Sequence, residues 1–343
     1  MQVMSVAVVI FILAFVLTWC LRIYAIKNNV IDIPNQRSSH SVPTPRGGGV
    51  AIVVAFSIGI IVLSAIGTVT LTQMLSLFTA GFVIAVVGFL DDHGHIAARW
   101  RLLMHFLAAG AGLFFLGQFP SVDLFGFQLS AGLPGMIFGL VYLVWMLNLY
   151  NFMDGINGLA SMEAVFFAFA SCIVITFAVP NALETNQVAI LSLLGSAALG
   201  FIFWNFPKAK IFMGDAGSGF LGIIIGLIVL HVSIMDSKLF LAEICLLGVF
   251  IVDATTTLLR RLIGGKKVYE AHASHTYQIL SRKYGSHKPV TIGAFFINIV
   301  WLLPIALFIS SGKISGVVGV VMAWLPLVVT AYRSGAGIQN KVS

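Results

Sequence analysis

Charged residues are scarce in this sequence. Asp, Glu, Lys and Arg make up 9% of its 343 residues, against about 25% in soluble domains. A soluble globule of this size could not cover its surface with so few charges. Hydrophobic residues make up 59%, so the composition predicts a lipid environment. Each span there needs about 20 mostly apolar residues in a helix, because unpaired backbone groups are costly in hydrocarbon.

Cysteines are few as well, and Cys20, Cys172 and Cys245 all lie inside apolar runs. Their spacing fits neither a metal site nor a disulfide framework, so we interpret them as small buried side chains. The sequence contains no low-complexity tract and no clear internal repeat. Residues 1–21 are apolar with no basic segment ahead of them, which favours a first span over a signal peptide. We therefore expect a single transmembrane domain over residues 1–343.

Eleven apolar segments predict an all-α, polytopic integral membrane protein. The expected spans are 3–23, 48–67, 72–90, 102–118, 133–150, 158–179, 188–205, 217–234, 239–259, 291–311 and 314–332. With the N-terminus outside, every one of the 19 Lys and Arg residues except Lys238 and Lys313 lies on the inner side. This asymmetry follows the positive-inside rule and predicts a cytoplasmic C-terminus in a bacterial inner membrane.

The net charge of +7 is explained by this topology and by anionic lipid, so we expect no nucleic-acid partner. The orientation also places five polar loops on the cytoplasmic face, where an active site would form. These loops are approximately 24–47, 91–101, 148–158, 206–216 and 260–290.

Two of the polar motifs are acidic. Asp91 and Asp92 end the third span, where a divalent cation or a basic partner would relieve their repulsion. The alternative is a solvated helix end paired with Arg99 or Arg101. Asp215 stands between glycines just before a span, where backbone N–H groups could bind an anion while Asp215 holds the accompanying cation. The alternative there is a helix cap followed by a small-residue packing face.

A third motif places Asn148, Asn151, Asp154 and Asn157 at intervals of three residues. On a helix each step turns by only about 60°, so neighbouring members share a face. Amides and a carboxylate on one face suit a phosphate, a sugar or a hydrated cation. The alternative is a polar seam between membrane helices.

The remaining two motifs are basic. Arg37 and Arg46 flank a proline-rich loop and could clamp a phosphate, or could simply anchor the chain on the inner side. His272 and His275 are three residues apart and could bind a metal, contact a phosphate or move a proton. Two histidines alone rarely make a zinc site, so an ordinary surface pair is the alternative.

The ordered set of motifs along residues 32–290 resembles the polyprenyl-phosphate N-acetylhexosamine-1-phosphate transferase superfamily, which includes MraY-, WecA- and WbpL-type enzymes. The set is Asp-x-Pro, Pro-Arg-x-Gly-Gly, Asp-Asp, Asn-x-x-Asp-Gly-x-x-Gly-Leu-Ala, Met-Gly-Asp-x-Gly-Ser and a His-containing loop. The segments PTPRGGGVAI, NFMDGINGLA and AHASHTYQ look most like the WbpL branch.

The resemblance implies transfer of an N-acetylhexosamine-1-phosphate from a UDP-sugar to undecaprenyl phosphate. The products would be undecaprenyl-diphosphate-sugar and UMP, which starts O-antigen or a related cell-surface polysaccharide. It also implies a magnesium cofactor, with manganese as an alternative.

The matching positions imply individual roles. Asp91, Asp92 and Asp154 are the expected catalytic residues, and Asp91 would deprotonate or orient the lipid phosphate. A strong base is not essential, because the second pKa of a phosphate monoester is about 6. Asp215 and Asp92 are the expected metal ligands. The expected substrate-binding residues are Arg46, Arg101, Asn148, Asn151, Asn157, His272 and His275. Among them, Arg46 and Asn148 are predicted from their side-chain chemistry and not from a family role.

Two departures from the family pattern affect specificity. Asn157 stands where many members have a second Asp, and Ser274 stands at an expected His position. The sugar therefore stays open among UDP-N-acetylglucosamine, UDP-N-acetylfucosamine and UDP-N-acetylquinovosamine. The oligomeric state also stays open, with a homodimer as one option.

A transporter or flippase is the alternative function. Glu163, Glu243 and Asp253 lie inside expected spans and could mark an ion path. A transporter, however, typically places its polar groups near the midplane and shows paired repeats. Here the polar motifs gather at one face, which favours the transferase.

Overall fold

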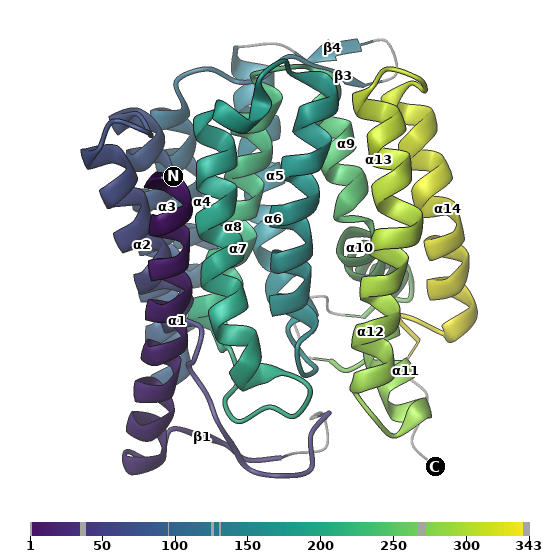
Figure 1. Cartoon of the computed structure of the whole chain (residues 1–343). Coiled ribbons are helices and arrows are strands. Elements are labelled where there is room, and N and C mark those ends of the chain that lie inside the picture. Colours follow the sequence, from purple (N-terminus) through teal and green to yellow (C-terminus); the bar gives the residue numbers. More distant parts are fainter. Residues whose placement is uncertain are drawn as a thin grey trace.

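The computed structural model describes residues 2–34, 39–94, 96–124, 127–129, 132–266 and 272–338, and it is a bundle of helices (Figure 1). The helices are α1 (Gln2–Lys27), α2 (Val50–Ala65), α3 (Leu71–His93), α4 (Ala98–Leu116), α5 (Leu133–Met153), α6 (Leu159–Ala178), α7 (Asn186–Asn205), α8 (Asp215–Ser233), α9 (Lys238–Leu246), α10 (Gly248–Ile263), α11 (Thr276–Tyr284), α12 (Lys288–Ile297), α13 (Leu303–Ser310) and α14 (Gly316–Ser334). Short helical turns are η1 (Ala182–Glu184) and η2 (Asn298–Leu302).

The predicted all-α, multi-pass membrane fold is confirmed, and each of the eleven expected segments contains a helix or a broken helix. Within the described ranges, eight helices are long and apolar enough to cross a membrane, or nine if α9 and α10 form one span bent by 75°. Helix α2 has only 16 residues, and α4 carries Arg99 and Arg101 in its first turn. The count of eleven spans is therefore not confirmed.

Helix α8 forms the centre of the bundle, where α3 and α5 pack against it. All of its residues from Ala216 to Ser233 are buried, which its many small residues allow. A Cβ atom at Gly222 would lie 2.8 Å from the Cα of Leu147 in α5, so the two helices touch through their backbones. Helices α1 and α14 lie at the periphery of the bundle (Figure 1).

A short ribbon orders the chain at the end of the bundle where α11 lies. Strand β1 (Ile31–Asp32) pairs antiparallel with β2 (Thr44–Pro45). The Phe212 N–H then donates to the Pro45 carbonyl at 2.8 Å, and the Gly48 N–H donates to the Phe212 carbonyl at 2.9 Å. The loops that precede α2 and α8 are thereby joined. A second ribbon, β3 (Val122–Leu124) and β4 (Phe127–Leu129), lies at the opposite end (Figure 1).

Candidate active site

The site is built on the close approach of α3 to the first turn of α8. A Cβ atom at Gly88 would lie 2.5 Å from the Ala216 nitrogen, so only glycine allows this packing. One turn later, the Asp92 carboxylate accepts the N–H groups of Asp215 at 3.2 Å and Ala216 at 3.4 Å. Gly214, at φ +80°, leaves the space that the carboxylate fills. Asp92 therefore caps the N-terminus of α8, where a negative charge is favoured.

On one side of Asp215, a network of polar side chains joins α3, α4 and α5. Arg101 lies 2.5 Å from the Asp91 carboxylate and 3.8 Å from that of Asp215. The Asn151 amide donates to Asp215 Oδ1 at 3.0 Å and to the Ser218 hydroxyl at 2.9 Å. The alternative pairing of Asp91 with Arg101 is thus present, and it makes Asp91 suited to orienting Arg101.

On the other side of Asp215 lies a polar cavity of about 240 Å³. Its lining includes Arg46, Asp92, Asp154, Asn157, Asp215 and Gln278. The Arg46 guanidinium donates to the backbone carbonyl of Asp92. Three carboxylates therefore face a cavity whose lining contains one arginine. Asp32, at the end of β1, adds a fourth acid to the wall.

Asp154 lies in buried and acidic surroundings that disfavour its charged form. Burial, followed by the nearby carboxylates of Asp215 and Asp92, raises the pKa of Asp154 well above its usual range. Among the residues that the structure describes, no N–H or O–H group donates to its side chain. A bound cation would offset both the free-energy cost of burying the charged carboxylate and its repulsion by the neighbouring carboxylates.

The loop after Asp154 is held by partners from several elements. His287 accepts the Asn157 N–H through Nδ1 at 3.3 Å and contacts the Ser39 carbonyl through Nε2 at 2.7 Å. Burial lowers the pKa of His287, which favours this neutral form with one accepting nitrogen. The Asn157 side chain donates to the Pro207 carbonyl at 3.4 Å. Asn157 therefore organises the cavity wall as well as facing the cavity.

The two predicted histidines lie apart from the polar cavity. His275 is only 2% exposed and forms the N-cap of α11. Its Nδ1 lies 3.6 Å from the Asp253 carboxylate of α10. Burial, with smaller contributions from His275 and Arg261, lowers the pKa of His272 to about 4, so this imidazole is neutral near pH 7. In this arrangement His275 supports α11, and neither ring lines the cavity.

The structure thus gathers Arg46, Asp92, Asp154, Asn157 and Asp215 around one cavity. A smaller hollow adjoins this cavity. It is lined by the other predicted residues of α3, α4 and α5, which are Asp91, Arg101, Asn148 and Asn151, and by Asp215 again. In that hollow the Asn148 amide lies 3.3 Å from Nδ1 of His105, a buried residue that the motifs did not single out.

Sequence reasoning missed Gln278, Asn205 and His287 as parts of the site, although all three line the polar cavity. Asn205 accepts the Gly158 N–H at 2.8 Å and donates to the Ile211 carbonyl at 3.0 Å, which joins two loops of the site. The only available signal for Gln278 was its place three residues after His275, as in a capping box.

The acidic residues fit a divalent cation that prefers oxygen ligands. No three His, Cys, Asp or Glu side chains within the described ranges form a preformed metal cage. Magnesium does not need one, because it typically uses one or two protein carboxylates together with substrate phosphates and water. Asp215 and Asp154 are available on the cavity wall, and the raised pKa of Asp154 marks the local deficit of positive charge.

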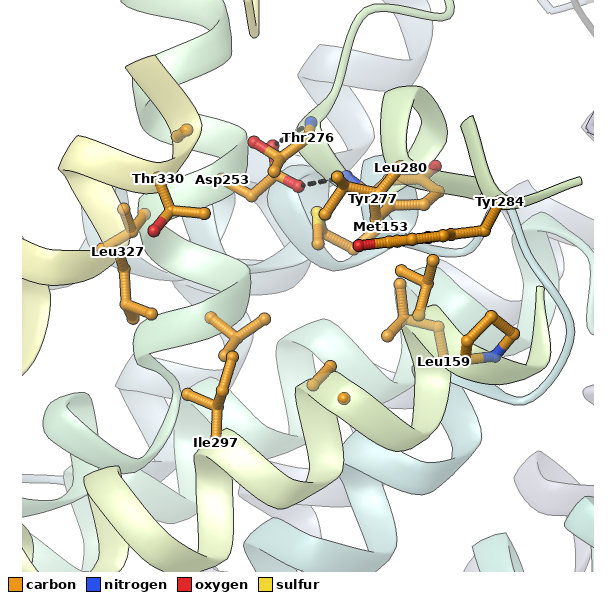
Figure 2. Close-up of a pocket in the computed structure, with 17 residues that line it drawn as sticks. Met153, Leu159, Asp253, Thr276, Tyr277, Leu280, Tyr284, Ile297, Leu327 and Thr330 are labelled. Atoms are coloured by element: carbon orange, nitrogen blue, oxygen red, sulfur yellow. Dashed lines mark hydrogen bonds between the residues drawn. The ribbon is translucent and has the colours of Figure 1, made fainter. Parts of the chain in front are cut away.

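Figure 2 shows an apolar cavity of about 240 Å³. Its walls come mainly from α10, α11, α12 and α14, and Leu280, Ile297 and Leu327 contribute apolar surface. Met153 lines this cavity and the adjacent Asp154 lines the polar one. A polar and an apolar compartment therefore meet at the end of α5.

The family model described as glycosyl transferase family 4 matches residues 74–233. The probable undecaprenyl-phosphate N-acetylglucosaminyl 1-phosphate transferase of Bacillus subtilis (strain 168) is 30% identical over 296 residues, which are 83% of this chain and 79% of the relative.

Two further relatives extend the range of similar proteins. The undecaprenyl-phosphate alpha-N-acetylglucosaminyl 1-phosphate transferase of Thermotoga maritima is 26% identical over 281 residues, 82% of this chain and 83% of the relative. A phospho-N-acetylmuramoyl-pentapeptide-transferase of Streptococcus pyogenes serotype M6 is 30% identical over 237 residues, 63% of this chain and 68% of the relative. The segment matched by the family model contains Asp91, Asp92, Asp154 and Asp215.

Proposed function

Because this chain belongs to the polyprenyl-phosphate N-acetylhexosamine-1-phosphate transferase superfamily, we propose that it transfers an N-acetylhexosamine-1-phosphate from a UDP-sugar to undecaprenyl phosphate. The products are undecaprenyl-diphosphate-sugar and UMP. The reaction takes place on the cytoplasmic face of the inner membrane and starts a cell-surface polysaccharide such as O-antigen.

The observation that carries this proposal is the meeting of two unlike cavities at the end of α5. The polar cavity, with Asp92, Asp154 and Asp215 in its wall, suits a metal-bound diphosphate. The adjoining apolar cavity suits the hydrocarbon of a lipid acceptor. A reaction that joins a nucleotide-sugar to a lipid phosphate needs both compartments side by side.

In the proposed reaction, an oxygen of the lipid phosphate attacks the β-phosphorus of the donor. The bond between that phosphorus and the bridging oxygen breaks, and UMP leaves with the bonding electrons. Arg101 lies beside both Asp91 and Asp215 and would hold an oxygen of the reacting phosphates. Asp91 fixes the Arg101 guanidinium, and no strong base is required because the phosphate is already largely ionised near pH 7.

Magnesium, held by Asp215 together with Asp92 or Asp154, would neutralise charge on the diphosphate during transfer. The protein's own contribution is positioning. Asp92 fixes the first turn of α8 through two backbone N–H groups, and Asn151 fixes the Asp215 side chain. These contacts hold the acids in place before the donor binds, which is how a phosphoryl-transfer site gains most of its rate.

The acids inside the spans do not support the transporter alternative. Glu163 accepts the Asn298 amide at 2.6 Å, and Glu243 accepts the Ser171 hydroxyl at 2.8 Å. Asp253 accepts the N–H groups of Thr276 and Tyr277. Each acid thus has a local structural partner on another element.

The proposal is tested by UMP release from the purified protein, assayed with undecaprenyl phosphate, magnesium and a panel of UDP-N-acetylhexosamines. We expect release that requires the lipid and the metal, and the best donor identifies the sugar. Absence of UMP with every donor, from protein that is folded and binds undecaprenyl phosphate, would contradict the assignment of these donors. Failure to bind the lipid as well would favour the transporter.

A further inference from the structure

Gln278 lies in the wall of the polar cavity, although none of the sequence motifs includes it as a site residue. It belongs to the first turn of α11 and is 8% exposed. Its Oε1 accepts the backbone N–H of His275 at 3.2 Å, and the His275 side chain in turn faces the Gln278 backbone N–H. The two residues form a capping box, which fixes both side chains.

The capping box also decides which end of the Gln278 amide faces the cavity. A backbone N–H needs an acceptor, so the amide oxygen must point toward His275. The two N–H groups of Nε2 are then what Gln278 offers to the cavity, opposite a wall that carries Asp92, Asp154 and Asp215. In the described part of the chain, no hydrogen bond uses these two N–H groups.

Asp253 fixes the helix that carries Gln278. Its carboxylate oxygens accept the N–H groups of Thr276 at 2.8 Å and Tyr277 at 3.0 Å (Figure 2). The Tyr277 hydroxyl donates to the Phe152 carbonyl at 2.9 Å, at the end of α5. Asp253 therefore ties α11 to α10, while Tyr277 ties it to the segment that leads into Asp154.

The hydroxyl of Tyr277 also explains a glycine in the neighbouring loop. It occupies the space where a Cβ atom of Gly155 would lie. A movement of α11 would therefore directly displace the backbone next to Asp154, against which the Tyr277 hydroxyl packs. The position of Gln278 relative to the three carboxylates depends on this chain of contacts from Asp253.

We propose that Gln278 is a donor-binding residue whose amide N–H groups contact an acceptor oxygen of the UDP-sugar, and that Asp253 is the positioning residue that holds Gln278 there. The inference rests on the proposed function and deepens it. The oxygen belongs either to the diphosphate or to the sugar, and both offer the acceptor that the amide requires.

The direct test is Gln278→Glu. One glutamate oxygen can still accept the His275 N–H, but the other replaces a donor with a negative charge facing acidic residues. A hydrogen bond to a charged group contributes about 1.5–3 kcal/mol, so we expect the KM for the UDP-sugar to rise about tenfold or more, with the KM for undecaprenyl phosphate unchanged. Gln278→Met removes the donor without adding charge, and we expect a smaller rise in the same constant.

Gln73→Glu is the matched control. Gln73 holds the same third position in the capping box of α3, where its oxygen accepts the Thr70 N–H at 3.3 Å. That box lies at the start of α3, and Asp92 lies at its far end. We expect this variant to keep the kinetic constants of the wild type, which separates loss of a donor contact from a general effect of the substitution.

Competition by UDP identifies the oxygen that Gln278 contacts. If the inhibition constant of UDP rises in Gln278→Glu by the same factor as the KM for the UDP-sugar, the contact is to the diphosphate. If inhibition by UDP is unchanged while the KM for UDP-sugar rises, the contact is to the sugar. Both results support the donor-binding role.

Asp253→Asn tests the positioning role through a double variant. If Asp253 acts through Gln278, combining Asp253→Asn with Gln278→Glu raises the donor KM no further than the worse single variant. Additive losses would overturn the positioning role. Should Asp253→Asn fail to fold, Thr257→Val provides the second variant, because the Thr257 hydroxyl donates to the Asp253 carboxylate at 3.1 Å.

The outcomes separate this inference from the proposed function. If the wild type releases UMP and Gln278→Glu keeps the wild-type KM for the donor, Gln278 does not contact the donor and the inference alone fails. If the wild type releases no UMP with any donor, the proposed function fails first, and the inference fails with it.

Discussion

The carboxylate of Asp92 accepts the backbone N–H of Asp215 at 3.2 Å, although the two residues are 123 positions apart in the sequence. The contact joins the last turn of α3 to the first turn of α8. It places two acids of the site on adjoining helix ends, and it depends on the absence of side chains at Gly88 and Gly214.

Gly88→Ala is expected to disrupt the junction. The added Cβ would lie 2.5 Å from a backbone nitrogen of α8, so the two helices must move apart. Overpacking of this kind costs about 1–3 kcal/mol, and we expect a lower melting temperature together with a loss of UMP release. Gly110→Ala in α4 is the control, because its Cβ would make only an ordinary contact, with the Leu140 side chain at 3.9 Å. Equal effects of the two variants would show that the junction is not sterically tight.

Asp154→Asn is expected to change how stability depends on pH. The pKa of Asp154 in the native state is raised well above 3.8, its ordinary value. Between 3.8 and the native pKa, the native state therefore keeps a proton that the unfolded state releases. The free energy of unfolding therefore falls as the pH rises through this window. Without metal, we expect the variant to be more stable than the wild type above the raised native pKa, and the advantage to shrink as the pH falls toward 3.8.

Thermal melting across this pH range checks the Asp154 prediction. Asp236→Asn serves as the control, since that residue lies after α8 and caps the Lys238 N–H at 2.9 Å. Magnesium should raise the melting temperature of the wild type more than that of Asp154→Asn, because the cation relieves the same repulsion. A stability difference that stays constant with pH would contradict the raised pKa.

Glu163→Gln and Glu243→Gln are expected to keep transferase activity. Glutamine retains an oxygen that can accept the Asn298 amide or the Ser171 hydroxyl, so the helix contacts persist. We expect UMP release within about threefold of the wild type, a change of less than about 1 kcal/mol. Abolished UMP release by both folded variants would contradict the purely structural role of these two acids.

The sequence was sufficient to predict the helices and the face on which the site forms, because apolar length and basic loops report these directly. It could not predict the 75° bend between α9 and α10, since the apolar run continues through Leu247 and Gly248. The number of spans was uncertain for a related reason. Helix α2 reaches only 16 residues, and composition alone does not show where its ends lie.

Within the site, the acids were found by their motifs, but their contacts were not. The pairing of Asp92 with the first turn of α8 depends on a close approach of two helices distant in the sequence. Asp253 had no account until the structure placed it at the N-terminus of α11. Gln278 was missed because the binding roles in the AHASHTYQ segment were assigned to its histidines, and the three-residue spacing from His275 indicates a helix cap rather than a ligand contact.

We propose that phosphoryl transfer takes place where α3 meets α8, with Asp215 at the centre of the site. The most direct measurement compares UMP release by Asp215→Asn with release by Asp236→Asn. Asparagine at position 215 keeps the backbone N–H that Asp92 accepts, so the fold should persist. We expect a loss of about 10²-fold or more for Asp215→Asn, with normal melting, and wild-type activity for Asp236→Asn. Near-normal turnover by folded Asp215→Asn would contradict the claim.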